Sequence, residues 1–304
     1  MPWLTGAGVA ISAAELASET MAAREISLTD IEQVRSHRWR TDSARQISDE
    51  RGALKFIAEL GFVLLMPISG TELPSIHAAT REQWSWWDWK QTLPGRKACY
   101  YAKILRRRGT FIAWKSFPLF YAAYADPRPY RHLYRDGLLD RAEKQILDLL
   151  DAQGPLMTRD IRLAFGPRSK ANTRRVKSML VSLQTRFLIT TAGGDTEGWS
   201  HHRWDLVDRW VPMRALAAAK TLSQREARAQ LVARFVENVV ATTPADIAWT
   251  FGWDRGEVDP LISDLLGRGE IATASAPELG GEMVVPARWP ARERRSRGRG
   301  RARG

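Results

Sequence analysis

The segment between residues 137 and 205 carries three helical patterns followed by two short strand patterns, and no other feature restricts the fold as strongly. The second helix is expected to start with Thr158 as its N-cap, and the third is expected to begin near Ser169. The two strand patterns lie at residues 187–191 and 203–206, around a glycine-rich loop. Three helices followed by a β-hairpin predict a winged-helix module.

The same order of elements is expected again between residues 221 and 290. Thr243-Pro244 is typical of a helix start, and Gly252 supplies the turn after that helix. Apolar residues near Ile271 and at 283–285 predict the two strands of a wing. The helix before this wing mixes acidic and basic residues, so we expect it to contribute little to phosphate binding.

A divergent module of the same kind is predicted in the N-terminal third. Helical patterns cover residues 27–34 and 49–60, and the apolar run 62–68 fits either a buried strand or the last turn of a helix. The expected fold class is therefore α+β, mainly α, built from tandem winged-helix modules with short β-wings. The predicted units are an extension (1–25), the divergent winged-helix-like module with an aromatic-rich insertion (26–136), two winged-helix modules (137–220 and 221–290), and a tail (291–304).

Positive charge is concentrated at the C-terminus. The net charge is +12, but residues 288–304 carry eight Arg and one Glu, so the other 287 residues carry only +5. The Arg/Gly-rich tail has no residue suited to a core, and we expect a disordered polycation that adds phosphate contacts without sequence preference. The candidate contacts are Arg294, Arg295, Arg297 and Arg299. A solubilising terminus without a binding role is the alternative.

Two basic groups in the folded part are candidate contacts to double-stranded DNA. The third helix of the 137–220 module begins with Lys170, Arg174, Arg175 and Lys177, and in helix-turn-helix proteins this helix faces the major groove. A cationic turn, Arg106-Arg107-Arg108-Gly109, is expected between two strands, where it could hold phosphates. In both groups an ordinary solvated charged surface is the alternative.

Glu72 and His77 follow the 62–68 run and are candidate catalytic groups. A carboxylate beside a base pocket could position water, or stabilise positive charge on the sugar during cleavage of an N-glycosidic bond. Glu72 could instead serve in a cap or an ion pair, and His77 could be a satisfied buried group. The tryptophans at 84, 86, 87 and 89 could stack on unpaired bases, although most are expected in the core.

The sequence does not indicate a disulfide-rich, metal-binding, cofactor-binding or membrane-spanning protein. Cys99 is the only cysteine, so a disulfide framework is excluded, and no Cys/His spacing suggests a metal site. No phosphate-binding loop or dinucleotide-binding glycine pattern is present, so no cofactor is expected. An apolar run long enough to span a membrane is also absent. We expect a cytoplasmic, nucleoid-associated protein without a membrane partner.

Several motifs between Gly154 and Trp253 resemble those of the tandem winged-helix DNA glycosylases of the AlkZ and YcaQ type. These motifs are the Gly-Pro-Leu sequence at 154–156, the stretch WDLVDRWVP at 204–212, and the stretch ATTPADI at 241–247. The resemblance implies DNA repair, with activity on a Gln-x-Gln or Gln-x-Asp motif in the N-terminal module. Leu64 and Met66 occupy those motif positions here, so the chain resembles a divergent, AlkZ-related member to which the family's mechanism does not carry over.

Three functions remain open at this point. The first is a monofunctional DNA glycosylase that hydrolyses N-glycosidic bonds of modified bases with a relocated catalytic group, for which Glu72 is the nearest candidate. The second is a non-catalytic protein that binds damaged or unusual double-stranded DNA, and Leu64 and Met66 favour it. The third is a transcriptional regulator that reads DNA sequence with the helix beginning at Ser169.

Overall fold

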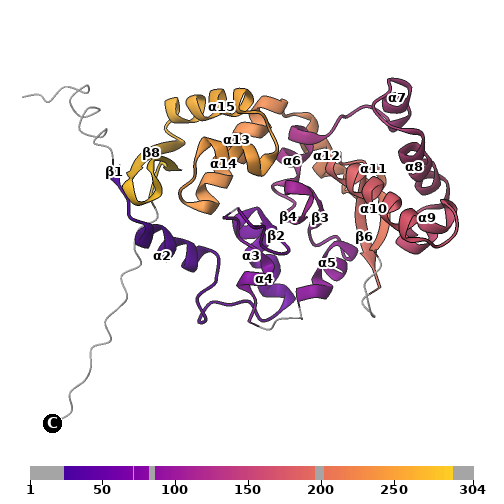
Figure 1. The fold of residues 1–304 in the computed structure, drawn as a ribbon, viewed down its shortest axis with the longest axis horizontal. Coiled ribbons are helices and arrows are strands. Elements are labelled where there is room, and N and C mark those ends of the chain that lie inside the picture. The colour runs from indigo at the N-terminus through magenta and orange to yellow at the C-terminus, as the bar shows by residue number, and fades with distance from the viewer. Residues whose placement is uncertain (1–23, 71, 82–85, 196–201, 290–304) are drawn as a thin grey trace, which may run out of the picture.

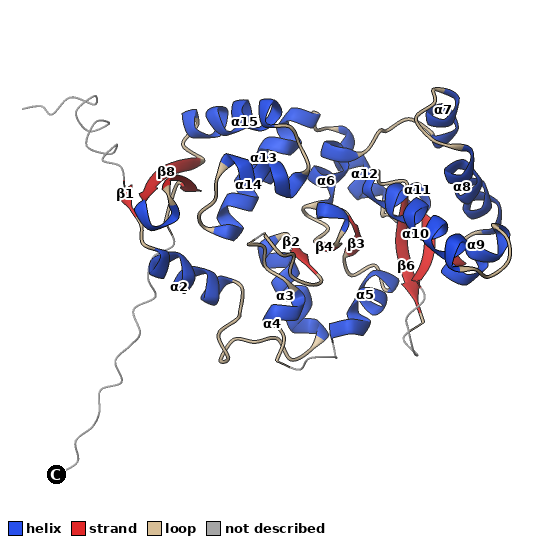
Figure 2. Cartoon of the chain, viewed as in Figure 1, coloured by secondary structure: helices blue, strands red, loops and turns tan. Residues whose placement is uncertain are grey.

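The structure is a computed structural model that describes residues 24–70, 72–81, 86–195 and 202–289. Within these residues, helices predominate and three small three-stranded sheets complete the fold (Figure 2), which confirms the predicted mainly α member of the α+β class. None of the helices in the described ranges is long and apolar enough to cross a membrane. Figure 1 shows the N-terminal third lying between a C-terminal unit on the left and the unit containing α8 to α10 on the right.

The unit on the right has the predicted order of three helices and a hairpin. Its elements are α8 (Arg141–Gln153), β5 (Leu156–Met157), α9 (Thr158–Ala164), α10 (Lys170–Thr185), β6 (Ile189–Gly194) and β7 (His202–Leu206). Strand β7 pairs antiparallel with both β5 and β6. The hydroxyl of Ser169 caps α10 by accepting a hydrogen bond from the Asn172 amide at 3.0 Å, as its position before the helix predicted.

The expected N-cap of α9 is wrong by one residue. Met157 occupies the cap position, and Thr158 is the first residue of the helix. The Thr158 hydroxyl instead donates to the carbonyl of His202 at 3.0 Å and accepts from the Trp204 indole at 2.9 Å. It therefore joins α9 to strand β7, a long-range contact that local sequence does not specify.

The C-terminal unit repeats this order of elements. It consists of α13 (Gln224–Val239), α14 (Pro244–Phe251), α15 (Arg255–Gly267), β8 (Ile271–Ala276), the short helix η2 (Pro277–Leu279) and β9 (Gly281–Pro286). Thr243 and Asp246 form a reciprocal capping box at the start of α14. Residues from the other end of the chain complete this unit, because β1 (Arg24–Glu25) pairs with β8 and α2 (Leu28–Arg38) packs on it through Ile31.

The N-terminal third surrounds a small antiparallel sheet in the order β2-β4-β3. Its elements are α3 (Glu50–Leu60), β2 (Phe62–Leu64), α4 (Ile76–Ala79), α5 (Trp86–Gly95), β3 (Tyr100–Lys103), the short helix η1 (Leu105–Arg107), β4 (Gly109–Ile112) and α6 (Phe117–Tyr124). The apolar run at 62–68 thus begins as a buried strand. The connecting helices are α7 (Tyr130–Arg135), α11 (Val207–Trp210) and α12 (Met213–Lys220).

One apolar core joins the N-terminal sheet to the C-terminal unit. The Phe62 ring of β2 lies 5.1 Å from the Phe120 ring of α6 and 6.4 Å from the Phe251 ring of α14, measured between centroids. Phe235 of α13 lies in the same buried cluster. Because these elements share a core, the hairpin of β3 and β4 is held in a fixed position against α14.

Candidate nucleic-acid interface

The three arginines predicted in a cationic turn lie at the end of the β3–β4 hairpin. The Thr110 hydroxyl fixes this turn, since it donates to the Arg108 carbonyl at 2.9 Å and accepts from the Leu105 amide at 3.3 Å. The side chains of Arg106, Arg107 and Arg108 are exposed. The hairpin therefore presents three guanidinium groups to solvent from a well-defined backbone.

The basic residues of α10 do not all lie on one face. An α-helix turns by about 100° per residue, so Lys170, Arg174, Lys177 and Gln184 fall in one stripe roughly 80° wide. Arg175 lies about 140° from Lys170 around the helix. Its guanidinium is 5.9 Å from the centroid of the ring of Phe165, the C-cap residue of helix α9. The stripe and Arg175 thus have different surroundings, and only the stripe faces the β3–β4 hairpin.

Gln184 anchors the stripe against the end of β3. Its side-chain oxygen accepts a hydrogen bond from the Lys103 amide at 2.9 Å, while its side-chain nitrogen donates to the Leu180 carbonyl at 2.8 Å. Helix α10 consequently packs beside β3 and η1. The pKa of Lys103 is lowered from its ordinary value, first by burial and then by the positive charges of Lys177 and Arg108.

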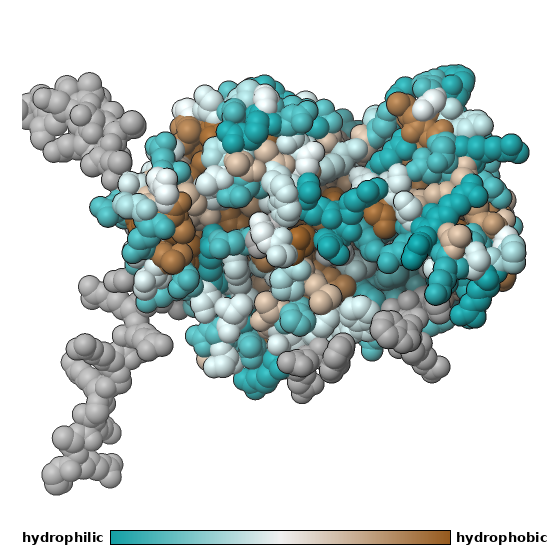
Figure 3. Space-filling model, in the orientation of Figure 1, coloured by the Kyte–Doolittle hydropathy of each residue, from teal (hydrophilic) through white to brown (hydrophobic). Residues whose placement is uncertain are grey.

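The two predicted basic groups therefore meet around Lys103, which the sequence analysis did not identify. We name their shared area the cationic surface; it consists of Lys103, Arg107, Arg108, Lys170, Arg174 and Lys177. Within the described part of the chain, none of these six side chains forms an ion pair with a carboxylate. In the view of Figure 3, which has the orientation of Figure 1, hydrophilic side chains gather on the right half of the molecule, over α8 to α10.

A hollow of about 470 Å³ lies at the N-terminal end of α10. Arg168, Ser169, Lys170, Thr173 and Arg174 line this hollow. The backbone amides at the start of a helix carry partial positive charge, so this end of the cationic surface offers both amide and guanidinium donors to an anion.

The positions of the family motif lie directly beside the cationic turn. These positions are Leu64 and Met66, and the amide of Leu65 between them donates a hydrogen bond to the Gly109 carbonyl at 2.8 Å. Leu64 is fully buried in the main core, whereas the Met66 side chain is 47% exposed. On the other side, the His77 amide donates to the Leu65 carbonyl at 3.1 Å, so His77 also lies next to the end of β2.

Glu72 has a structural partner. Its carboxylate forms an ion pair with Arg35 of α2. Arg35 is only 8% exposed, and its guanidinium also donates to the carbonyls of Val239 and Ala241, at 2.7 and 2.9 Å. Burial lowers the pKa of Arg35 to about 10. Glu72 thus stabilises a buried cation that connects α2 to the end of α13. Among the described residues, no hydrogen bond or ion pair joins Glu72 to His77.

The aromatic cluster contributes mainly to packing. Trp86 and Trp89 are buried, Trp87 is partly buried, and the His77 ring contacts the Trp86 ring edge-on at 5.1 Å. Trp84 and the four tail arginines, Arg294, Arg295, Arg297 and Arg299, lie outside the described residues. A different tryptophan, Trp249, lies next to Arg106 of the cationic turn.

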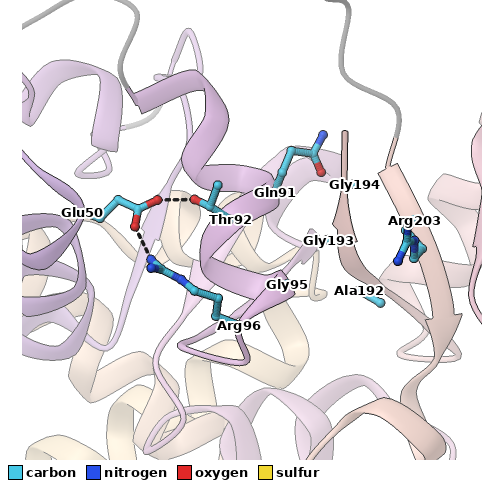
Figure 4. Close-up of a pocket in the computed structure, with 9 residues that line it drawn as sticks. All are labelled: Glu50, Gln91, Thr92, Gly95, Arg96, Ala192, Gly193, Gly194 and Arg203. Carbon is cyan, nitrogen blue, oxygen red and sulfur yellow. Dashed lines mark hydrogen bonds and ion pairs between the residues drawn. The ribbon is translucent and has the colours of Figure 1, made fainter. Parts of the chain in front are cut away.

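A polar cleft of about 390 Å³, not predicted from the sequence, lies between α5 and β6 (Figure 4). The Glu50 carboxylate accepts from Thr92 and pairs with Arg96, so this carboxylate is already neutralised. Gly95 and Gly193 approach so closely that a Cβ on Gly193 would lie 3.1 Å from the Cα of Gly95. Within the described ranges, no group of three or more His, Cys, Asp or Glu side chains is placed to hold a metal ion.

Repeated units of three helices and a β-hairpin, with basic side chains on the third helix of one unit, define the helix-turn-helix class of architecture. A family model described as AlkZ related matches residues 47–252. The chain belongs to the AlkZ-related family.

The fold comparison agrees with this membership. The Streptomyces sahachiroi DNA glycosylase AlkZ matches with a TM-score of 0.53 at 13% sequence identity, over 86% of this chain and 70% of that chain. At this identity the match shows a common fold. No curated protein matches the chain in sequence. The fold and the family predicted from the sequence are thus confirmed.

Proposed function

We propose that this protein binds double-stranded DNA through the cationic surface and recognises damaged or unusual DNA without excising a base. The main support is that two basic groups, far apart in the sequence, meet around Lys103 and form no ion pair with any carboxylate that the structure describes. Uncompensated cations that repel one another cost stability, and a phosphate backbone would remove that repulsion. Binding of chromosomal DNA would place the protein in the cytoplasm, with the nucleoid.

The composition at the motif positions favours recognition over excision. Leu64 is sealed in the core, and Met66 offers only a thioether, which is a weak hydrogen-bond acceptor. Neither side chain can orient a hydrolytic water. Excision remains the second candidate, because the backbone hydrogen bond from His77 to Leu65 brings a residue capable of proton transfer to the end of β2, next to the motif positions in the chain. Sequence-specific regulation is a weaker alternative, since phosphate contacts alone carry no sequence information.

Removal of residues 291–304 is expected to weaken duplex binding mainly at low salt. Each phosphate contact that is lost reduces the slope of log affinity against log salt concentration by about 0.9. Titration of a fluorescent duplex with the full chain and with the truncated chain, at several KCl concentrations, measures both slopes. A truncated chain with an unchanged slope would show that the tail makes no phosphate contact.

Glu72→Gln tests the excision alternative together with the role of the Arg35 ion pair. Because Glu72 is 64% exposed at its side chain, we expect the variant to lose at most about 1 kcal/mol of stability and to bind duplex DNA like the wild type. Base release from a duplex carrying alkylpurines or a crosslink, detected as alkali-labile strand breaks, measures excision. We expect no breaks with either protein; breaks that vanish in the variant would establish a glycosylase with Glu72 as its catalytic group.

A further inference from the structure

Trp249 is an exposed aromatic residue at the end of the cationic turn. Its neighbours on α14, Ile247, Ala248 and Phe251, are buried, whereas Trp249 remains 39% exposed. Burial of a tryptophan would stabilise the fold, and an indole left in water forgoes that stabilisation. Packing in the core therefore does not explain why the indole of Trp249 is exposed.

Arg106 holds the Trp249 side chain in place. Its guanidinium carbon lies 4.2 Å from the centroid of the indole ring, and the same side chain donates to the Trp249 carbonyl at 3.2 Å. Such a cation–π pair uses one face of the ring. An indole whose one face is covered by Arg106 and which remains well exposed can offer its other face to a planar group.

The backbone of the turn is shaped to bring Arg106 to this position. Arg106 and Arg107 have φ values of +49° and +60°, in the left-handed region that residues other than glycine and asparagine rarely adopt. Two consecutive arginines in that region are more strained than glycine or asparagine would be. Strain of this kind is typical of residues whose side chains serve a ligand.

We propose that the Arg106–Trp249 stack is a platform for one unpaired base, so that the protein binds a duplex containing an extrahelical base more tightly than an intact duplex. Proteins that bind unpaired nucleic acid combine a cationic backbone track with aromatic rings on which bases stack, and both features occur here side by side. This inference rests on the proposed DNA binding. The phosphates on either side of the extrahelical base would lie along the cationic surface.

The test compares two duplexes that differ only by one nucleotide, an intact duplex and the same duplex with a single extrahelical 2-aminopurine inserted near its centre. Fluorescence anisotropy of an end label gives both affinities for the full chain, and 2-aminopurine emission reports stacking. One stacked base is expected to make binding of the bulged duplex about tenfold tighter and to quench its emission. Trp249→Ala should abolish both effects while affinity for the intact duplex changes less than about twofold.

Two control variants make the result specific. Trp249→Phe keeps an aromatic ring and should keep most of the preference. Tyr134→Ala removes an aromatic ring that is similarly exposed (38%) and lies 5.4 Å from the Lys144 ammonium group on α8, and it should change nothing. Equal affinity of the wild type for both duplexes, or a preference that survives in Trp249→Ala, would overturn the platform alone. Absence of binding to either duplex would overturn the proposed function as well.

Discussion

The double variant Arg108→Gln/Lys177→Gln is expected to bind an intact duplex roughly 50-fold more weakly than the wild type at about 0.1 M salt. If each residue contacts one phosphate, loss of both lowers the salt slope by about 1.8. The affinities of the variant and the wild type are expected to become equal near 1 M salt. With slopes that differ by about 1.8, a tenfold lower salt concentration then separates the two affinities by nearly two orders of magnitude. Anisotropy titrations across a KCl series measure the affinities and the slope together.

The same variant is expected to be at least as stable as the wild type. Burial and the charges of Lys177 and Arg108 lower the pKa of Lys103 in the folded state. The charged form of this amine is therefore less favourable in the folded protein than in the unfolded chain, which reduces the free energy of unfolding at pH 7. This cost is fully present below the folded pKa, decreases as the pH rises above it, and is absent once the pH exceeds the ordinary pKa of a lysine. Removal of two neighbouring charges raises that pKa and reduces the cost at pH 7, which thermal denaturation detects as an unchanged or higher Tm.

A matched control separates local contacts from net charge. Lys55 on α3 and Lys220 on α12 are exposed and lie outside the cationic surface. The variant Lys55→Gln/Lys220→Gln removes the same charge and is expected to bind within about twofold of the wild type, since screening limits distant charges. Equal losses in the two double variants would mean that total charge, rather than the cationic surface, determines binding.

Leu64→Gln is expected to destabilise the protein by about 3 to 5 kcal/mol. The substitution removes a fully buried leucine from the main core and leaves an amide there without water. At roughly 2 to 4 °C per kcal/mol for a chain of this size, Tm should fall by about 10 °C. Circular dichroism at rising temperature measures this change.

Met66→Gln is the control at the other motif position. Because this side chain is 47% exposed, the variant should melt within about 2 °C of the wild type. If Leu64→Gln melted like the wild type, Leu64 would not be buried in the core. Burial would then not explain why this chain lacks a polar motif residue at position 64. If the expected difference is observed, a polar residue at position 64 requires changes in the surrounding core.

The sequence predicted those elements that depend on local rules. Ser169 and Thr243 mark helix starts because a hydroxyl before a helix caps its first amides. The strand expected at 187–191 instead runs from Ile189 to Gly194, into the segment predicted as a glycine-rich loop. Local rules could not decide the state of the 62–68 run, since a buried strand and a buried helix end are both apolar. The pairing of β1 with β8 joins residues about 250 positions apart, and no local pattern encodes it.

The candidate interface was predicted in two parts that the sequence could not connect. Arg106 to Arg108 and the basic half of α10 were both identified, but their contact depends on the hydrogen bond between Lys103 and Gln184, which are 81 residues apart. Helical periodicity alone would have separated Arg175 from the stripe. Trp249 was not identified as a candidate contact, because a tryptophan at helical spacing is more often buried than exposed.

The most direct test of the cationic surface is amine-reactive labelling of the full chain with and without a saturating duplex, read by mass spectrometry at each lysine. Lys170 and Lys177 are exposed in the free protein and should become several-fold less reactive when DNA covers them, whereas Lys55 and Lys220 should react equally in both samples. Protection of Lys55 or Lys220, with Lys170 and Lys177 still reactive, would place the DNA elsewhere and contradict the proposed interface.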